Sequence, residues 1–190
     1  MENQSRQPWN KGKLVGQIRL QLGHRTRDLA LFNLAIDSKL RACDLVKLRL
    51  LDVAHEGQVA ARAMVMQQKT HHPVQFEITE LTRQSLRDWI KTASLRPDAF
   101  LFPSRVRASA HLSTRQYARI VHRWVTEIGL DGAAYGTHTM RRTKTSLIYR
   151  RPKNPRAVQL LLGHTKLEST VRYLGIEVDD DLEMAEQTEV

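Results

Sequence analysis

Apolar residues recur at helical spacing along most of the chain. RDLALFNLAI, residues 27–36, is apolar on most of its sides, which predicts a buried helix. DLVKLRLLDV, residues 44–53, predicts a short helix that passes into extended backbone. After Thr79, the spacing of Leu86 and Ile90 indicates a further helix. Helices are therefore expected to supply most of the core.

Three helices in the second half of the chain are predicted from their end signals. A helix over residues 113–129 opens with a serine and a glutamine three residues apart, a capping box, and stops at a glycine. A helix over residues 137–150 has a threonine placed to cap its first turn. A helix over residues 154–163 starts at an Asn-Pro pair and has a glycine just past its end.

In the second quarter of the chain the period of the apolar residues changes to two. Small apolar residues alternate from Val59 to Val65, and after KTHHP a second alternation runs from Val74 to Ile78. This pattern predicts two strands around a turn that contains Lys69. The predicted fold class is therefore mainly α with a small antiparallel β-sheet (α+β), and the sheet is expected on one side of the helices.

Charge is the most informative bulk property. Of the 190 residues, 30 are Lys or Arg and 20 are Asp or Glu, which gives a formal net charge of +10. Residues 177–190 hold seven acidic side chains and no Lys or Arg, so residues 1–176 carry 30 basic and 13 acidic side chains, a net charge of +17. A basic body of this size favours a polyanionic partner, with nucleic acid ahead of an anionic membrane.

Other classes of function receive no support from the sequence. No apolar run approaches the roughly 20 residues that span a bilayer. The polar residues 1–13 lack the apolar stretch of a secretory signal. The single cysteine, Cys43, has no partner for an internal disulfide and is expected to be a packing residue. His71 and His72 are adjacent residues, which in extended backbone point to opposite faces, and the histidines of the chain show no paired ligand spacing, so no metal site is predicted.

Two basic residues stand at positions where a ligand would explain them. Arg41 falls at or just before a helix start, where a cation opposes the helix dipole. A bound anion accounts for it, and so does an ion pair with Asp37 or Asp44. Lys69 sits in a polar hairpin turn, where most lysines are simply solvated, although a turn lysine can also reach a ligand and donate a proton.

The segment GTHTMRRTKTSLIYRR places several cationic groups together. At about 100° per residue, His138, Arg141 and Arg142 share one face of the predicted helix, while Met140 and Leu147 lie on the opposite face. An Arg fork near a helix N-terminus matches the oxygens of a phosphate. Taken alone, however, this segment is explained better by a solvated basic face.

Each of these features is weak alone, but their order along the chain is specific. In that order the residues are Arg41, Lys69, His138, Arg141, His164 and Tyr173. The series resembles, in order and spacing, the catalytic residues of the tyrosine recombinases, the phage-integrase superfamily. The strongest parts are HTMRRT and the LLGH that precedes Tyr173 by nine residues. The resemblance runs from about residue 25 to 178 and implies the catalytic-domain fold of that family.

The resemblance implies a site-specific recombinase that cleaves and rejoins DNA strands. Tyr173 is expected to be the nucleophile that forms a covalent 3′-phosphotyrosyl bond. Arg41 and Arg141 are expected to clamp the phosphate oxygens, with His164 assisting, because attack at phosphorus adds negative charge to those oxygens.

The resemblance also implies how protons move. Lys69 is the family's general acid toward the leaving 5′-oxygen, and His138 is expected to act as general acid or base toward the tyrosine. The covalent link conserves the energy of the broken bond, so no ATP is needed, and cationic side chains replace a metal ion. No cofactor is therefore expected.

The implied partners are double-stranded DNA, further copies of the chain in a homotetramer on paired sites, and accessory proteins. The expected compartment is the reducing cytoplasm, in association with DNA. Three alternatives remain open on the sequence: a type IB topoisomerase-like DNA relaxer, a non-catalytic DNA-binding regulator that keeps a recombinase-like fold, and an RNA-binding module. The low aromatic content of 6% disfavours the last of these.

The domain organisation expected from the resemblance has three parts. Residues 1–24 form a basic N-terminal arm with an abbreviated first helix, residues 25–178 the catalytic domain, and residues 179–190 an acidic tail. The size is similar to that of stand-alone catalytic-domain members such as the fimbrial-switch inverters. The sequence leaves open whether the tail docks on a neighbouring protomer, folds back in cis or is disordered.

Overall fold

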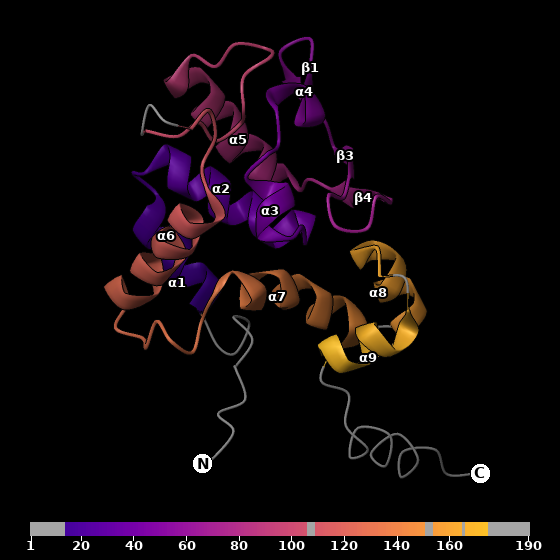
Figure 1. The fold of residues 1–190 in the computed structure, drawn as a ribbon. Coiled ribbons are helices and arrows are strands. Elements are labelled where there is room, and N and C mark those ends of the chain that lie inside the picture. The colour runs from indigo at the N-terminus through magenta and orange to yellow at the C-terminus, as the bar shows by residue number, and fades with distance from the viewer. Residues whose placement is uncertain (1–13, 106–108, 151–153, 165, 175–190) are drawn as a thin grey trace, which may run out of the picture.

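Helices form most of the molecule (Figure 1). The computed structural model describes residues 14–105, 109–150, 154–164 and 166–174. The helices are α1 (Leu14–Leu22), α2 (Thr26–Ser38), α3 (Ala42–Leu45), α4 (Leu50–Val53), α5 (Glu80–Ala93), α6 (Thr114–Glu127), α7 (Thr137–Arg150), α8 (Pro155–Leu162) and α9 (Leu167–Leu174). Most of the predicted arm and the whole acidic tail lie outside the described residues, so the division into arm, domain and tail stays a prediction.

Capping signals in the sequence locate two of the helices well. Before α6, the side chain of Ser113 accepts a hydrogen bond from the backbone of Gln116, and the Gln116 side chain accepts one from the backbone of Ser113. Before α8, the side chain of Asn154 accepts from two backbone N–H groups of the first turn. α8 ends at Gly163 in the left-handed conformation, at φ 63°. The side-chain bonds of Ser113 and Asn154 satisfy backbone N–H groups that a helix N-terminus leaves unpaired.

The prediction of one short helix over residues 44–53 is wrong. Two short helices, α3 and α4, replace it, separated by a turn at Val46 and Lys47 and by extended backbone at Arg49. The extended backbone predicted after the helix is present, at Ala54–His55. The reason for the break lies elsewhere in the chain, because the segment after α5 pairs with this connection. Leu101 N donates to Leu48 O at 2.7 Å, and Leu50 N donates to Ala99 O at 3.0 Å.

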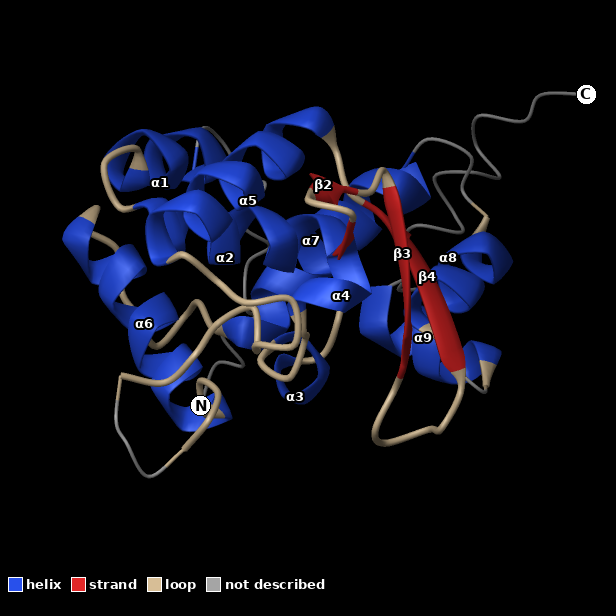
Figure 2. Cartoon of the chain, turned by 90° about the horizontal axis from the view of Figure 1, so that it is seen from above, coloured by secondary structure: helices blue, strands red, loops and turns tan. Residues whose placement is uncertain are grey.

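The sheet structure is small and antiparallel, as predicted, but it comprises two sheets rather than one. The strands are β1 (Ala54–His55), β2 (Gln58–Val59), β3 (Arg62–Met66) and β4 (Pro73–Glu77). β1 pairs with β2, and β3 pairs with β4. Figure 2 shows β3 and β4 on one side of the helical body, beside α8.

The alternation predicted from Val59 to Val65 is interrupted in the middle. Ala60 N turns to Val53 O at 2.9 Å, while Ala61 O accepts from Ile78 N at 2.8 Å, so β2 and β3 face different partners. Within β3 the alternation holds, because Ala63 is buried and its neighbours on both sides are exposed. The pattern therefore located the hairpin correctly and missed the break before it.

α2 passes through the centre of the core. Every residue from Ala30 to Ser38 is buried, which agrees with its apolar residues on most sides. The helix packs against α1, α5 and α7. Phe32 meets Trp124 of α6 edge to face, with ring centroids 5.6 Å apart and an angle of 84° between the rings. α2 thereby fixes the positions of the helices that carry the candidate site.

The predicted faces of α7 are only partly correct. Met140 is buried and His138 is exposed, as expected. Arg141, however, is buried to 3% exposure, whereas Leu147 is 46% exposed. The guanidinium of Arg141 is buried because two backbone carbonyls accept hydrogen bonds from it. A solvated basic face therefore does not describe this helix.

A buried ion-pair network joins the C-terminal end of α2 to β4 and α7. Lys144 Nζ lies 2.7 Å from Asp37 Oδ1 and 2.5 Å from Glu77 Oε1. Lys39 Nζ, in a side chain with 0% exposure, lies 3.1 Å from Glu77 Oε2 and donates to Asp37 O at 2.8 Å. The other oxygen of Asp37 accepts hydrogen bonds from the hydroxyls of Thr79 and Thr82. The network fixes the chain immediately before Arg41.

We expect Asp37→Asn to lower the free energy of unfolding by about 3 kcal/mol at neutral pH, because a buried ion pair loses one partner. Burial alone would raise the pKa of Asp37, but hydrogen bonds from Lys144, Thr82 and Thr79 outweigh it and hold the pKa below its usual value. The carboxylate therefore stabilises the fold above the unfolded-state pKa of about 3.9, and this contribution is lost as pH falls through the lower folded-state pKa.

Urea denaturation at pH 7 and at pH 3 measures both effects. Asp88→Asn is the matched control, since Asp88 is exposed on α5 and bonded to Gln84 within the same helix. We expect the control to change stability by about 0.5 kcal/mol or less. Equal unfolding midpoints for the two variants at pH 7 would contradict the structural role of Asp37.

Candidate active site

Arg41 stands at the N-terminal end of α3, as the N-cap residue. Its Nη1 donates to the side-chain oxygen Oε1 of Gln67 at 2.6 Å. Within the described residues, neither Asp37 nor Asp44 bonds to it, because Asp37 pairs with Lys144 and Asp44 accepts from the backbone of Gln68. The hydrogen-bond partner of the Arg41 guanidinium is therefore a neutral amide, which does not neutralise its positive charge.

Arg141 reaches the same place from α7. Its Nε donates to Lys39 O at 2.6 Å, and its Nη2 donates to Leu162 O at 2.8 Å. Lys39 adopts the left-handed conformation, at φ 56°, where α2 ends. This guanidinium also has neutral partners in those two carbonyls, and its orientation is fixed by two separate segments of the chain.

Gln67 connects these two arginines and was not predicted as a site residue. It is 1% exposed, and its Oε1 accepts from both Arg41 and Thr70 Oγ1. Its Nε2 donates to Leu162 O at 3.1 Å, so Gln67 and Arg141 share one acceptor. The sequence did contain a signal, because Gln67 continues the inward alternation of Ala63 in β3 and is thus a polar residue on a buried face.

Gly163 allows this close approach. A Cβ atom at this position would lie 2.5 Å from Val74 Cγ2 and 3.0 Å from Gln67 Oε1. Its φ of 63° also disfavours any other residue. The turn after α8 can therefore lie directly against the β3–β4 hairpin, which places His164 beside the arginines.

His164 is a neutral imidazole at physiological pH. Burial, followed by the charges of Arg141 and Arg41, lowers the pKa of His164 to about 4. Its Nδ1 lies 3.0 Å from Thr170 Oγ1 in α9, and its backbone N donates to Gln159 O. The side chain can therefore exchange hydrogen bonds with an anion without adding a third positive charge to the site.

The remaining predicted residues surround this cluster to different degrees. Lys69 is exposed in the turn between β3 and β4, two residues after Gln67. His138 is exposed in the first turn of α7, three residues before Arg141. Tyr173 lies in α9, which packs against α7 and α8, but its side chain is outside the description. Gln67 and Leu162 O thus link Arg41 to Arg141, and His164 lies close enough for both arginine charges to lower its pKa.

Neither Cys43 nor a metal ion is assigned to this site. The Cys43 thiol is half-buried, and burial followed by the neighbouring Asp44 carboxylate raises its pKa, which disfavours the nucleophilic thiolate. Over the described residues, no group of three or more His, Cys, Asp or Glu side chains has the arrangement of a metal site.

We expect Gln67→Leu to slow strand cleavage by about 10²-fold, because small misplacements of positioned groups have effects of this size. The variant removes the shared bonds to Arg41 and to Leu162 O but no group that would touch the reacting atoms. Single-turnover cleavage and DNA affinity should be measured together, and affinity should change by about threefold or less, since the surface charges remain.

Gln68→Leu is the matched control for this change. Gln68 is the next residue and is exposed, and its side chain bonds outside the cluster, to Lys47 and to Cys43 O. If Gln67→Leu and Gln68→Leu cleave equally well, Gln67 does not position the arginines. A thermal midpoint close to the native value for Gln67→Leu excludes general unfolding as the cause of slower cleavage.

The sequence profile of the phage integrase family matches residues 19–178. This match covers most of the chain. The chain belongs to the phage integrase family. The predicted resemblance to the tyrosine recombinases is thereby confirmed.

Similar proteins of this family carry the names of recombinases. A Bacillus subtilis (strain 168) protein described as a probable integrase/recombinase YoeC is 31% identical over 158 residues, which cover 83% of this chain and 82% of that protein. A tyrosine recombinase XerC of Neisseria gonorrhoeae is 29% identical over 155 residues, which cover 80% of this chain and 48% of that protein. The chain spans about half the length of this XerC relative. These similarities place the chain among the tyrosine recombinases of the phage integrase family.

Solved structures in the family share the fold. XerA recombinase matches with a TM-score of 0.74 at 19% identity, covering 91% of this chain and 62% of its own. XerH recombinase bound to palindromic difH substrate matches with a TM-score of 0.74 at 19% identity, covering 96% of this chain and 53% of its own. The mainly helical fold with small antiparallel sheets is therefore that of the tyrosine recombinase catalytic domain, which confirms the predicted fold class.

Proposed function

We propose that this phage integrase family member is a site-specific DNA recombinase that cleaves and rejoins DNA strands through a covalent 3′-phosphotyrosyl intermediate. The observation that carries the proposal is the cluster of two arginines and a neutral histidine around Gln67 and Leu162 O. Hydrogen bonds to a neutral amide and to two backbone carbonyls orient Arg41 and Arg141, and the positive charges of the two guanidinium groups favour a negatively charged group at this cluster. A phosphodiester supplies that group.

The proposed roles of the cluster follow from the charge that develops during the reaction. Attack at phosphorus places additional negative charge on the non-bridging oxygens. Arg41 and Arg141 stabilise that charge as preorganised guanidinium donors. His164 donates a hydrogen bond as a neutral imidazole, which its lowered pKa permits across the physiological range.

The covalent step exchanges one phosphoester bond for another. The Tyr173 oxygen forms a bond to phosphorus, the bond from phosphorus to the 5′-oxygen breaks, and the strand stays attached through its 3′-phosphate. His138 accepts the proton of the tyrosine hydroxyl, and Lys69 gives a proton to the leaving 5′-oxygen. Rejoining is the reverse reaction with a second 5′-hydroxyl, so neither ATP nor a metal ion takes part.

The proposed partners are double-stranded DNA, three further copies of the chain on paired sites, and accessory proteins. XerH was solved in complex with difH DNA, and the Tn1549 integrase with a circular intermediate DNA. For this chain the net charge of +17 over residues 1–176 supports a DNA partner. Among the described residues, no helix is long and apolar enough to cross a membrane. We place the protein with DNA in the cytoplasm.

Covalent capture tests the proposal directly. Fragmented genomic DNA of the source organism is incubated with the protein in EDTA and without ATP, and the mixture is then denatured in detergent. DNA that stays attached to protein is recovered and sequenced. We expect attachment at a recurring sequence, through 3′-phosphate ends, because only a nucleophilic side chain leaves a bond that survives denaturation.

Other outcomes separate the alternatives. Attachment spread over unrelated sequences, together with relaxation of any supercoiled plasmid, identifies a topoisomerase-like relaxer. Binding to DNA without any attachment identifies a non-catalytic regulator and overturns the proposal. A nicked duplex built on the recovered sequence then serves as the substrate for rate measurements, because loss of the short 5′-hydroxyl strand traps the intermediate.

A further inference from the structure

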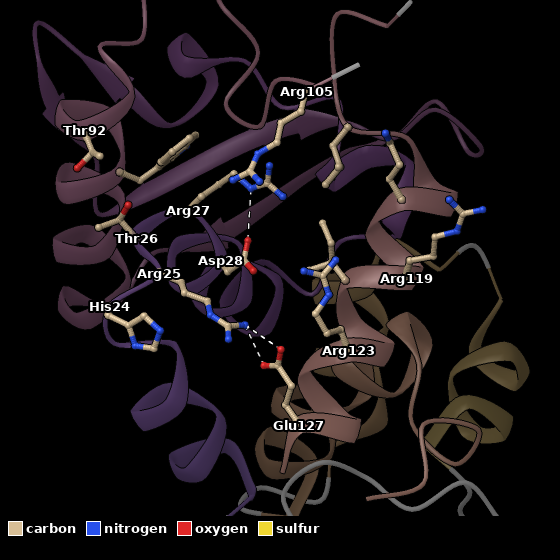
Figure 3. Close-up of a pocket in the computed structure, with 14 residues that line it drawn as sticks. His24, Arg25, Thr26, Arg27, Asp28, Thr92, Arg105, Arg119, Arg123 and Glu127 are labelled. Carbon is tan, nitrogen blue, oxygen red and sulfur yellow. Dashed lines mark hydrogen bonds and ion pairs between the residues drawn. The ribbon is translucent and has the colours of Figure 1, made fainter. Parts of the chain in front are cut away.

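A second basic site lies apart from the candidate active site. A pocket of about 640 Å³ opens between the start of α2, the C-terminal half of α5 and α6 (Figure 3). None of Arg41, Arg141 and His164 lines it. We call it the arginine pocket, because five arginines line it: Arg25, Arg27, Arg105, Arg119 and Arg123.

The acidic side chains of the arginine pocket do not neutralise it. Glu127 forms an ion pair with Arg25 at 2.9 Å, and Asp28 lies 3.4 Å from Arg27 Nε. Both pairs appear as dashed lines in Figure 3. Across the described ranges, Arg105, Arg119 and Arg123 have no ion pair with an acidic side chain. Five cations thus face two anions, and the pocket keeps a formal charge of +3.

Arg27 is the most deeply buried cation of the arginine pocket, and its surroundings favour a further anion. Its side chain is only 13% exposed, and within the described structure the ion pair of its buried Nε with Asp28, at 3.4 Å, lacks the geometry of a hydrogen bond. Burial lowers the pKa of Arg27, and the charges of Arg105 and Arg123 lower it further against the opposing effect of Asp28. A buried donor whose nearest acceptor is poorly placed can gain a hydrogen bond, so a ligand oxygen at this position would stabilise the protein.

The first turn of α2 lines the same pocket. Thr26, Arg27 and Asp28 of its first turn line the pocket, and the N-cap residue Arg25 makes no side-chain capping bond. The first N–H groups of a 13-residue helix carry partial positive charge and need acceptors. This feature adds to the guanidinium groups and favours the same kind of ligand, an anion with several oxygens.

The shape of the arginine pocket distinguishes among anions. Arg105, Arg119 and Arg123 stand on its rim and are exposed, whereas Arg27 lies deep. A small anion enclosed in the pocket would be surrounded by cations on all sides. A DNA backbone can instead run along the exposed rim arginines and place one phosphate near the buried Arg27. α6, which carries two of the rim arginines, packs against α3, whose N-terminus holds Arg41. The pocket and the candidate active site thus belong to one packed body.

We propose that the arginine pocket binds backbone phosphates of DNA that lie outside the cleaved bond. The proposal rests on the proposed recombinase function, because it assigns a second contact with the same DNA. Guanidinium forks match phosphate oxygens two at a time. Contacts of this kind hold the duplex in register without reading its sequence.

The experiment compares two double variants with the same change of net charge. Arg119→Gln/Arg123→Gln removes two exposed rim charges. Arg87→Gln/Arg96→Gln is the matched control, since these exposed arginines pair with Glu80 and Asp98 outside the pocket. DNA affinity is measured over a range of salt concentrations, on the recovered recombination site and on an unrelated duplex.

We expect the rim variant to lower the slope of log affinity against log salt by about 2, because each phosphate contact contributes about 0.9. The loss of affinity should be about tenfold or more at low salt and equal on both duplexes, as for any backbone contact. Covalent attachment at saturating DNA should proceed at the native rate. A loss no larger than in the control overturns the proposal.

Two additions identify other occupants of the pocket. If inorganic pyrophosphate at constant ionic strength binds the DNA-free protein tightly, and the rim variant abolishes this binding, the site is one for small anions and the DNA assignment is overturned. If the rim effect on DNA affinity disappears once residues 179–190 are deleted, the acidic tail occupies the pocket instead. If native protein attaches covalently while the salt slopes are unchanged, the recombinase function stands and only the pocket assignment fails.

Discussion

Replacement of Tyr173 by phenylalanine is expected to abolish covalent attachment to DNA while DNA affinity stays within about twofold of the native value. The substitution removes one oxygen, the atom that would form the bond to phosphorus, and leaves the aromatic ring. The measurement is single-turnover reaction with a nicked duplex, followed by denaturing electrophoresis of the protein–DNA adduct. Peptide mapping of the native adduct should locate the DNA on α9.

Two matched substitutions test whether the other tyrosines take part. Tyr135→Phe and Tyr149→Phe make the same chemical change at half-buried positions and should leave attachment intact. Tyr117 is excluded by its setting, because its ring is 2% exposed and burial raises the pKa of its hydroxyl, which donates to Met140 Sδ. An adduct that persists in Tyr173→Phe would show that the spacing from His164 identified the wrong nucleophile.

Arg141→Lys is expected to slow cleavage by about 10³-fold with only a small change in DNA affinity, since removing one transition-state donor costs about 10²–10³ in rate. The substitution keeps the positive charge, so a slower cleavage rate would show that the planar geometry of the guanidinium is needed. The native guanidinium bonds to Lys39 O and Leu162 O at the same time. A lysine ammonium is a single point charge and cannot reproduce this planar fork.

Arg142→Lys is the internal control for this prediction. Arg142 is the next residue of α7 and is half-buried, and we expect its replacement to change the rate by about threefold or less, because the hydrogen bonds that join Arg41 to Gln67, and Gln67 and Arg141 to Leu162 O, do not involve Arg142. The thermal midpoint of both variants should be measured, because Arg141 also joins α7 to the turn after α8. A near-native cleavage rate for Arg141→Lys, with intact fold, would remove Arg141 from the proposed site.

The sequence predicted best those features that short-range chemistry decides. The capping residues Ser113 and Asn154 act within one helical turn, and the bonds that they make are those their residue types predict. Features that depend on distant segments were missed. The break between α3 and α4 arises because Leu48 and Leu50 pair with residues 99–101, and no pattern within residues 44–53 predicts that pairing.

The candidate site divides in the same way. The order of its residues along the chain identified the family, but not the environment of each residue. Arg141 is buried because Lys39 O, 102 residues away in sequence, accepts its hydrogen bond. Gln67 was overlooked because a single polar residue at an inward position has little weight until its partners are known. Proximity of such groups follows from tertiary packing and not from local pattern.

The sharing of Leu162 O by Gln67 and Arg141 bears on when the protein becomes able to act during its synthesis. Gln67 and Leu162 are 95 residues apart, and the acceptor lies at the end of α8, close to the last described helix. While the chain is still emerging from the ribosome and Leu162 has not been added, Gln67 Nε2 and Arg141 Nη2 lack the acceptor that they share. The orientation of both side chains is therefore completed only when the end of α8 has been synthesised and has packed against the β3–β4 hairpin.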